Sequence, residues 1–467
     1  MIQKVQFKKI TAVFVLVAIC LSLVSCASAP SVSTETVSHP LETENYPIPA
    51  EREPVPLDGK KLTIGIWCGT HHDFFFATMM LLKEAGIDQI IGPDDLWTGE
   101  DGMLEMLDRA EQFGISVIPN LRGWDLKEVP AYADHPALQG FLMWDEPSAT
   151  DFDWLADAKE KFRSMMPEDK VFYVNLFPQP CSYESLYGEN YDSNAVNYET
   201  NYVDVFLRKV QPEQLSVDYY PLMEGNLIRP SYYQNLETLA YRAKDNDIPL
   251  EVTVQNSGHD TTDGRYVSPS VQQLRWQMAV AMTYGASTLD HYIFTSHEET
   301  YAPMVDFNTL KPTELFENAK TVDLELRAWE DIYCSYRWLG SGKVDTAESN
   351  MMLLRLTKSL PQDQWGVLSN IESDGDVIFG IFENAYGENA YMITNAGSTT
   401  EIPGKDYLAN FEINDANVCL QFNVENCHYL KVISGGESEY VKQSADGTFQ
   451  FTIPAYDGVF VIPLIEN

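Results

Sequence analysis

Basic residues are scarce in this chain. Lys and Arg number 31 against 69 Asp and Glu, which gives the 467 residues a formal net charge of −38 at pH 7. Nucleic acids and anionic lipid surfaces are bound through clusters of positive charge, so this balance argues against both as partners. It suits an exported protein that binds a neutral or cationic ligand.

Cysteine is also sparse. The sequence has seven Cys residues, and two of them, Cys20 and Cys26, belong to the N-terminal segment. The dispersed, odd-numbered remainder does not form a disulfide framework. The sequence has no CxxC pair and no spaced cluster of His and Cys of the kind that binds zinc. We therefore expect no metal and no cofactor.

The N-terminus carries a short apolar run over residues 11–24, after a basic start at Lys4, Lys8 and Lys9. A run of this length is too short for a comfortable membrane span and predicts a signal peptide over residues 1–25. Residues 26–56 are rich in Ser, Thr, Pro and Glu without apolar periodicity, which is typical of a disordered tether.

The apolar run ends in Leu23-Val24-Ser25-Cys26, which resembles a bacterial lipoprotein signal. In such signals small residues precede a cysteine that is acylated and becomes the new N-terminus. The resemblance implies lipidation of Cys26 and a protein anchored to the bacterial cell membrane, facing outside the cytoplasm, without a spanning helix. Ordinary signal cleavage nearby, which would leave a free thiol, is the alternative.

From about residue 60 strand-like and helix-like segments alternate, which is the signature of βα units. Eight such pairs predict an α/β fold, a (β/α)8 TIM barrel over residues 57–338. The predicted strands are 62–67, 89–91, 116–119, 138–144, 171–176, 215–221, 250–254 and 288–294.

Beyond residue 338 the pattern changes to short alternating segments separated by Gly, Asn and Asp turns. This change predicts a C-terminal antiparallel β-sandwich over residues 345–467. Its predicted strands are 351–356, 377–382, 390–394, 418–422, 429–433, 449–453 and 458–463.

The fourth predicted barrel strand stops abruptly at Asp145-Glu146-Pro147. Barrel enzymes place their chemistry at the C-terminal ends of their strands. Pro147 favours an extended backbone at Glu146, which would aim this side chain. We therefore interpret Glu146 as the proton donor of a carbohydrate-cleaving site. The alternative is an acidic turn in which Asp145 caps the next helix.

The other strand ends collect aromatic and polar side chains. Sugar rings stack their C–H faces on aromatic planes, and their hydroxyls need polar partners, so this mixture is typical of carbohydrate sites. The alternative is that the aromatic residues pack beneath loops. The candidate binding residues are Trp67, Asp95, Arg122, Trp144, Asn175, Tyr219, Tyr220, Gln255, His291 and Tyr292.

An eight-unit barrel, an acidic motif ending the fourth strand and a trailing β-sandwich together resemble the TIM-barrel glycoside hydrolase clan. That clan places its acid/base glutamate after an Asn at this strand end, commonly as Asn-Glu-Pro. Here Asp145-Glu146-Pro147 stands in that place. The resemblance implies that Glu146 is the general acid/base and that a carbohydrate is the partner.

The second carboxylate of the clan is a glutamate at the end of the seventh strand, where this sequence has Gln255. Asp218, or Glu298 with its neighbour Glu299, could replace it, and the separation from Glu146 would decide between retention and inversion. Asp145 and Glu146 could instead act as the adjacent Asp-Glu of β-hexosaminidases does, with the substrate's acetamido group as nucleophile. A third possibility is a surface lipoprotein that binds carbohydrate without cleaving it.

Overall fold

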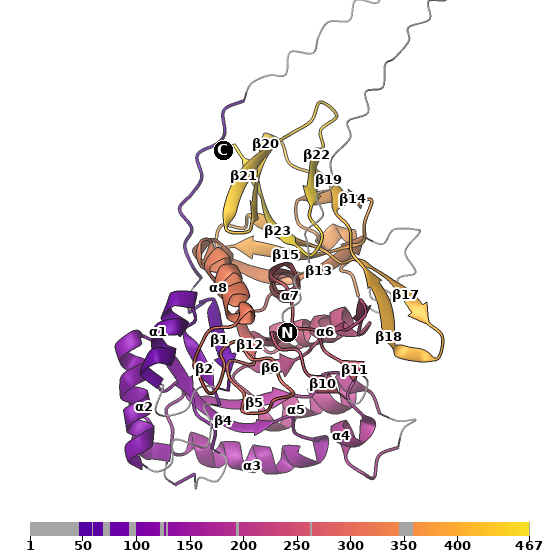
Figure 1. Cartoon of the computed structure of the whole chain (residues 1–467). Helices are drawn as coiled ribbons and strands as arrows, with labels where there is room; N and C mark the ends of the chain where they lie inside the picture. Colours follow the sequence, from indigo (N-terminus) through magenta and orange to yellow (C-terminus); the bar gives the residue numbers. More distant parts are fainter. Residues whose placement is uncertain are drawn as a thin grey trace, which may run out of the picture. The chain divides into compact units, whose positions relative to one another are not determined.

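The computed structural model describes residues 46–57, 59–68, 75–92, 100–121, 126–127, 129–192, 196–261, 264–344 and 358–466. From Tyr46 onward the chain forms one compact unit (Figure 1). The signal peptide, the first part of the tether with Cys26, the predicted strand 351–356, and the candidates Asp95 and Arg122 lie outside the described residues.

Eight parallel strands form the predicted barrel. They are β1 (Thr63–Trp67), β2 (Gln89–Ile91), β3 (Ser116–Ile118), β4 (Gly140–Asp145), β5 (Val171–Leu176), β6 (Leu215–Asp218), β9 (Leu250–Gln255) and β12 (Thr288–Tyr292). They pair in the order β3-β2-β1-β12-β9-β6-β5-β4. Parallel bridges from Val117 to Leu138 and from Asn120 to Leu142 join the two ends of this order and close the sheet. The predicted fold class is confirmed.

Helices follow most of these strands and surround the barrel (Figure 1). Helix α1 shows why they form, because Phe75, Met79 and Leu82 recur at helical spacing, are fully buried and face the strands. Gly86, with a φ of 77°, ends this helix. The helices are α1 (Phe75–Ala85), α2 (Glu100–Phe113), α3 (Phe152–Arg163), α5 (Asp204–Val210), α6 (Tyr232–Asp245), α7 (Val271–Thr283) and α8 (Glu314–Arg327).

Two antiparallel sheets make up most of the C-terminal region and enclose a core that includes Phe379, Tyr391 and Phe449. The larger sheet contains β13 (Tyr336–Val344), β15 (Val377–Asn384), β16 (Asn389–Asn395), β23 (Gly458–Ile465), β20 (Cys427–Ser434) and β21 (Glu437–Lys442). The smaller contains β14 (Leu368–Ser373), β19 (Ala416–Phe422) and β22 (Phe449–Ile453).

A separate hairpin, β17 (Ser398–Ile402) and β18 (Lys405–Glu412), links this region to the barrel. It pairs with β8 (Leu227–Ile228), which itself pairs with β7 (Leu222–Met223) in the segment after β6. A C-terminal hairpin therefore supports a loop that follows a barrel strand.

Barrel and sandwich share an interface along α7. Trp276 donates from Nε1 to the carbonyl oxygen of Asn395 at 2.9 Å. A Cβ atom at Gly380 would lie 2.2 Å from the carbonyl oxygen of Thr283, so only glycine allows the strand and the helix to approach this closely. The hydrophobic core accordingly runs without a break from the barrel into the larger sheet.

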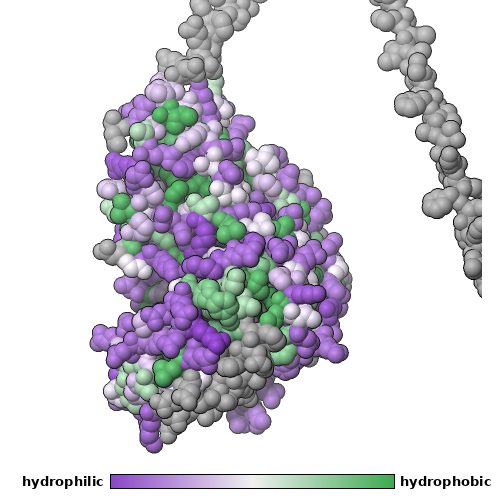
Figure 2. Space-filling model, turned by 60° about the vertical axis from the view of Figure 1, so that its left-hand side comes forward, coloured by the Kyte–Doolittle hydropathy of each residue, from purple (hydrophilic) through white to green (hydrophobic). Residues whose placement is uncertain are grey.

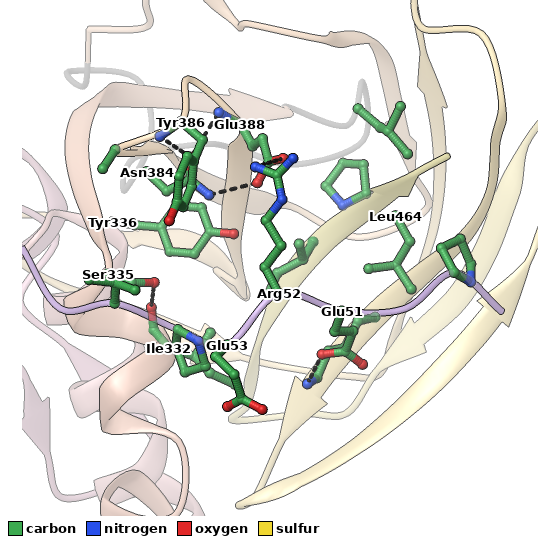
Figure 3. Close-up of a pocket in the computed structure, with 18 of the residues that line it drawn as sticks. Glu51, Arg52, Glu53, Ile332, Ser335, Tyr336, Asn384, Tyr386, Glu388 and Leu464 are labelled. Atoms are coloured by element: carbon green, nitrogen blue, oxygen red, sulfur yellow. Dashed lines mark hydrogen bonds and ion pairs between the residues drawn. The ribbon is translucent and has the colours of Figure 1, made fainter. Parts of the chain in front are cut away.

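Residues 46–56, which the sequence assigned to the tether, have neither helix nor strand but contact the sandwich. The ring of Tyr46 stacks on His428 with centroids 3.6 Å apart. Arg52 pairs with Glu388 at 3.0 Å, and Figure 3 shows its side chain reaching toward that carboxylate beside a cavity of about 150 Å³. This part of the segment lies along the folded unit.

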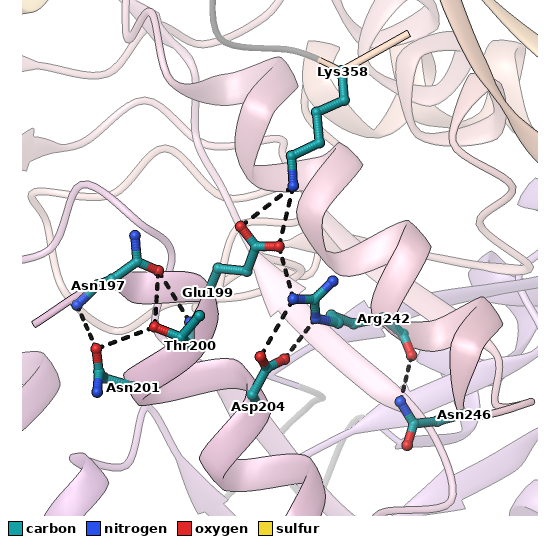
Figure 4. A network of polar contacts seen from close by, with 8 residues as sticks. All are labelled: Asn197, Glu199, Thr200, Asn201, Asp204, Arg242, Asn246 and Lys358. Atoms are coloured by element: carbon teal, nitrogen blue, oxygen red, sulfur yellow. Dashed lines mark hydrogen bonds and ion pairs between the residues drawn. The ribbon is translucent and has the colours of Figure 1, made fainter. Parts of the chain in front are cut away.

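The long segment after β5 contains α4 (Tyr183–Tyr187) and the π-helical turn Tyr198–Val203. Arg242 on α6 holds it in place, with an ion pair to Glu199 at 2.7 Å and another to Asp204 at 2.6 Å. Lys358 adds a contact to Glu199 at 3.2 Å (Figure 4). This predicted loop is thus fixed to the barrel wall.

On the face shown in Figure 2, hydrophobic residues form separate patches among hydrophilic ones. Exposed large apolar side chains belong to several elements, including Phe76 and Met80 on α1 and Trp154 on α3. Scattered exposure of this kind is normal and marks no particular interface. No helix in the described ranges is long and apolar enough to cross a membrane.

Candidate active site

A pocket of about 200 Å³ opens at the C-terminal ends of the barrel strands. Strands β1, β4, β5, β6 and β12 contribute to it, together with loops after β6, β9 and β12. Its lining residues are Trp67, Asp145, Glu146, Asn175, Asp218, Tyr220, His259, Tyr292 and Tyr301. Seven of the sequence-derived candidates are therefore brought together here.

Asn175 joins two of the carboxyl groups. Its Nδ2 atom donates to Oδ1 of Asp145 at 3.1 Å and to Oδ1 of Asp218 at 2.9 Å. The amide can supply one hydrogen to each, so both carboxyls are bound as acceptors. Strands β4, β5 and β6 lie side by side in the barrel, and their ends place these three side chains in a row.

Glu146 has a left-handed backbone with a φ of 54°, a conformation that few residues other than glycine adopt. The extended backbone predicted from Pro147 is therefore wrong. Because the strand alternation ends at this turn, Asp145 and Glu146 both line the pocket although they are adjacent. Asp145 does not cap the following 3₁₀ turn, since Ser148 occupies the N-cap position.

Burial raises the pKa of all three carboxyl groups, and neighbouring charges add to the shift at Glu146 and Asp218. Burial, and then the charges of Asp218 and Asp145, raise the pKa of Glu146 to about 9. Burial and the charge of Asp145 raise the pKa of Asp218 to about 7, against hydrogen bonds from Asn175 and Tyr220. The side chain of Asp145 is exposed to solvent through the pocket. Burial by the surrounding protein nevertheless raises its pKa, while the hydrogen bond from Asn175 lowers it.

These shifts separate the carboxyl groups by role. At neutral pH Glu146 holds a proton, as a general acid requires, while Asp218 is close to its titration point. Two carboxyls whose surroundings separate their pKa values form the usual arrangement for acid and base chemistry. The site can therefore protonate a leaving group on one side and supply a carboxylate on the other.

Aromatic rings form the rest of the pocket wall. Tyr220 stacks on Tyr292 with centroids 5.4 Å apart, and His259 stacks on Tyr301 at 4.6 Å. Trp67 is fixed by a hydrogen bond from its Nε1 to Oγ1 of Thr253 at 3.0 Å. Burial lowers the pKa of His259, so its ring is neutral near pH 7. This wall offers ring planes rather than charge.

Three predicted binding residues are buried in other contacts. Tyr219 bonds to Ser231 at 2.8 Å, and His291 pairs with Asp323 at 3.0 Å. Each is the strand neighbour of a pocket residue, and successive side chains of a strand point to opposite sides. Gln255 is also buried, and its Nε2 donates to the carbonyl oxygens of Leu222 at 2.9 Å and Val267 at 2.8 Å.

Two further candidates face solvent outside the pocket. The side chain of Trp144 is 43% exposed and packs against Trp154, with ring centroids 5.3 Å apart. Glu298 is exposed in the loop after β12, where its backbone N–H donates to Ser296. A register shift between Leu142 and Trp144 changes the alternation of β4 ahead of the acidic pair. Of the two candidates for the second carboxylate, Asp218 lines the pocket and Glu298 does not.

Sequence reasoning missed two lining residues, His259 and Tyr301. Both come from loops, where no strand periodicity indicates direction. His259 lies only four residues after Gln255, where β9 ends. This closeness to a strand end is the one feature of the sequence that could have indicated His259 as a pocket residue. Tyr301 follows β12 by a longer loop and carries no such signal.

No protein-family model matches this sequence, and no curated protein matches it. Solved structures resemble it at low similarity. A GH42 β-galactosidase from G. stearothermophilus is 9% identical, with a TM-score of 0.48, over 88% of this chain and 99% of that one. A β-galactosidase from the Antarctic haloarchaeon Halorubrum lacusprofundi is 11% identical, with a TM-score of 0.45, over 86% and 99%.

A β-galactosidase from the psychrophilic Marinomonas ef1 is also 11% identical, with a TM-score of 0.37, over 57% of this chain and 60% of that one. These named structures are glycoside hydrolases. With identity this low and TM-scores below 0.5, the similarity assigns neither activity nor substrate to this chain. The same barrel hosts many unrelated reactions, so function has to be argued from the site.

Proposed function

We propose that this chain is a glycoside hydrolase that cleaves O-glycosidic bonds in a poly- or oligosaccharide. Glu146 donates the proton to the leaving glycosidic oxygen. The observation that carries the proposal is the position of Glu146 beside Asp145 and Asp218 in an aromatic-walled pocket, which keeps its carboxyl protonated at neutral pH. A sugar ring would stack on the aromatic wall while its hydroxyls meet the carboxyl side.

Asp218 is the second carboxylate in this proposal. It lines the same pocket, and Asn175 and Tyr220 both stabilise its ionised form. It would attack the anomeric carbon or activate a water, depending on its separation from Glu146 once substrate is bound. In the substrate-assisted route Asp145 would instead orient an acetamido group of the substrate.

Two asparagine variants separate these routes. Asp218→Asn should abolish cleavage of every substrate if Asp218 is the nucleophile or base. In the substrate-assisted route, cleavage should require an N-acetyl sugar, and Asp145→Asn should be the more damaging change. Assaying both variants on matched N-acetylated and plain glycosides decides the matter.

A carbohydrate-binding protein without catalysis is the second candidate, and one observation favours it. Gln255 occupies the place of the clan's nucleophile, and its amide is committed to the backbone of Leu222 and Val267. In that case the pocket would hold a sugar without breaking its linkage.

A glycan-library screen with the parent and the Glu146→Gln variant tests the proposal. Gln has the shape and charge of the protonated acid, so the variant should fold and bind. Glu298→Gln is the matched control, because Glu298 is exposed outside the pocket. Cleavage by the parent and the control but not by Glu146→Gln supports hydrolysis. Binding by all three without cleavage would leave the binding-only function.

We also propose that Cys26 carries the acyl chains of a lipoprotein and holds the enzyme at the outer side of a bacterial cell membrane. The apolar run before Cys26 and the Ser-, Thr- and Pro-rich segment after it support this proposal. Mass spectrometry of the mature N-terminus tests it. Acylation of Cys26, and release of a Cys26→Ala variant from the membrane fraction, is the expected result; an unmodified thiol would contradict it.

A further inference from the structure

A chain of hydrogen bonds runs from the pocket into the barrel interior. Oγ of Ser216 donates to Oδ1 of Asn175 at 3.0 Å and lies 2.8 Å from Oη of Tyr173. Tyr173 in turn donates to Oε1 of Glu251, whose other oxygen accepts from Gln214 at 2.6 Å. Asn175, Ser216, Tyr173 and Glu251 are all buried, so water does not compete for these bonds.

The Ser216 hydroxyl has one hydrogen and three acceptors within reach. Besides Asn175 and Tyr173, Oε1 of Glu251 lies 3.2 Å away. The hydroxyl hydrogen of Tyr173 already binds that carboxylate oxygen. Among the described residues, Oδ1 of Asn175 accepts a hydrogen bond only from Ser216. A buried amide oxygen without a donor is costly, so the hydrogen of Ser216 belongs to Asn175.

This bond fixes which way round the Asn175 amide lies. With Oδ1 held by Ser216, Nδ2 must face the pocket, where it donates to both Asp145 and Asp218. If the amide turned over, its oxygen would face two carboxylates, and at least one of them would need a proton to form a bond. The orientation of one amide therefore controls the charge of the pocket.

We propose that Ser216 is a positioning residue that acts through Asn175 to favour the ionised forms of Asp145 and Asp218, so that the proton of the site stays on Glu146. The catalytic meaning of this inference rests on the proposed function. The charge distribution itself can be measured without any substrate.

Other titratable groups lie near Asp145, Glu146 and Asp218 and contribute to the electrostatics of these carboxyls. They come from the segment after β5, the segments after β6 and β11 (Gly264–Arg265), strand β12 and the barrel interior. They are Cys181, Tyr198, Tyr202, Tyr220, Tyr266, Tyr292, Glu251 and Asp290. Burial keeps the cysteine and the tyrosines protonated through neutral pH, so the Asp and Glu carboxyls are the groups that exchange protons there.

Carbodiimide coupling of glycine methyl ester, followed by peptide mass spectrometry, reports the protonated fraction of each carboxyl across a pH series. In Ser216→Ala the amide loses its anchor. The labelling midpoints of Asp145 and Asp218 should then rise by about one to two pH units, as expected for lost hydrogen bonds to charged groups. The midpoint of Glu146 should fall, because its neighbours carry less negative charge.

The opposite directions distinguish positioning from simple loosening. A looser pocket admits water and would move all three midpoints downward, toward ordinary values. Ser341→Ala is the matched control, because Ser341 is also buried and donates to a buried carboxylate, Glu237, at 2.9 Å, outside this network. It should leave the three midpoints unchanged.

Tyr173→Phe provides a second route if Ser216→Ala does not fold. This variant removes the hydroxyl that donates to Oε1 of Glu251, so the Ser216 hydroxyl can donate to Glu251 instead of to Asn175. We expect the labelling midpoints to shift in the same directions as in Ser216→Ala, but by less. Unchanged midpoints in a folded Ser216→Ala or Tyr173→Phe protein, or a common downward shift, would overturn the inference. Since labelling does not depend on turnover, this outcome is separate from a failure to find hydrolysis.

Discussion

The backbone N–H of Glu146 donates to the carbonyl oxygen of Asn175 at 2.9 Å. The bond carries the pairing of β4 with β5 one residue beyond the end of β4, just where the backbone turns left-handed. The turn brings Asp145 and Glu146 to the same pocket, which adjacent residues of a regular strand do not reach. The unequal proton affinities of the site follow from this crowding.

Activity should depend on pH through two carboxyls. Cleavage requires a protonated Glu146, with a pKa of about 9, and an ionised Asp218, with a pKa of about 7. We expect kcat/KM to fall below about pH 7, as Asp218 gains a proton, and above about pH 9, as Glu146 loses its own. A profile with its maximum near pH 5 would contradict these assignments.

Stability should also depend on Glu146. Its pKa is higher in the folded state than the ordinary 4.5, so folding binds a proton, and stability is lost as pH rises from about 4.5 to about 9. Glu146→Gln cannot titrate. The melting temperature of the variant relative to the parent should therefore be higher by a few degrees at pH 9 than at pH 5, measured by calorimetry.

If the melting temperatures of Glu146→Gln and the parent differ by the same amount at pH 5 and at pH 9, then Glu146 is not buried beside other negative charges. Glu298→Gln serves as the control for this comparison too, because its side chain is exposed and lies outside the pocket. It should change the melting temperature little at either pH.

Placing a glutamate at position 255 should not create a nucleophile. Gln255→Glu would place a carboxylate where an amide donates to the carbonyl oxygens of Leu222 and Val267. We expect a loss of about 1–3 kcal/mol in the free energy of unfolding, since buried acceptors lose their donor. Urea unfolding measures it.

Gln362→Glu is the matched control for this change, because the amide of Gln362 also donates to a backbone oxygen, that of Ser369, but on the surface. Gln362→Glu should change the free energy of unfolding little. A Gln255→Glu protein that is fully stable and more active than the parent would contradict the structural role given to Gln255.

The barrel and the sandwich should unfold together. Thr283 on α7 contacts Thr394 on β16 at 2.7 Å between their hydroxyl oxygens, within the shared core. Thr283→Val keeps the shape but removes this bond and should cost about 1 kcal/mol without splitting the unfolding transition. Thr283 also donates from Oγ1 to the carbonyl oxygen of Ala279 in its own helix, at 2.9 Å. Thr321→Val is the control, because Thr321 donates in this second way to the carbonyl oxygen of Glu317 at 2.9 Å but is exposed.

Separate transitions for the two halves would contradict the single unit. Equal costs for Thr283→Val and Thr321→Val would show that the contact across the interface adds nothing.

The barrel could be predicted from the sequence because buried parallel strands are continuous apolar runs. Strand β5 (Val171–Leu176) is buried at every position and was predicted at its exact bounds. Strand β21 (Glu437–Lys442) was missed, because it is exposed along most of its length and shows no apolar alternation. Strands β17 and β18 were missed for a related reason, since most of β17 is not buried.

The site was predictable to the strand end but not to the side-chain direction. Tyr219 and Tyr220 differ by one position, and only the place where β6 stops decides which of them faces the pocket. The left-handed turn at Glu146 opposes the local preference set by Pro147 and depends on the bond to Asn175 from the neighbouring strand. Contacts between distant segments fixed these details.

The leaving-group dependence of cleavage tests the role of Glu146 most directly. On the sugar that the glycan screen identifies, the natural linkage needs a proton on its leaving oxygen, whereas a 2,4-dinitrophenyl glycoside leaves without one. On the natural linkage, Glu146→Gln should lower kcat/KM by about 10²–10⁴-fold. On the activated glycoside, kcat/KM of the variant should stay within about tenfold of the parent value. Equal losses on both substrates, or no loss on either, would contradict Glu146 as the proton donor.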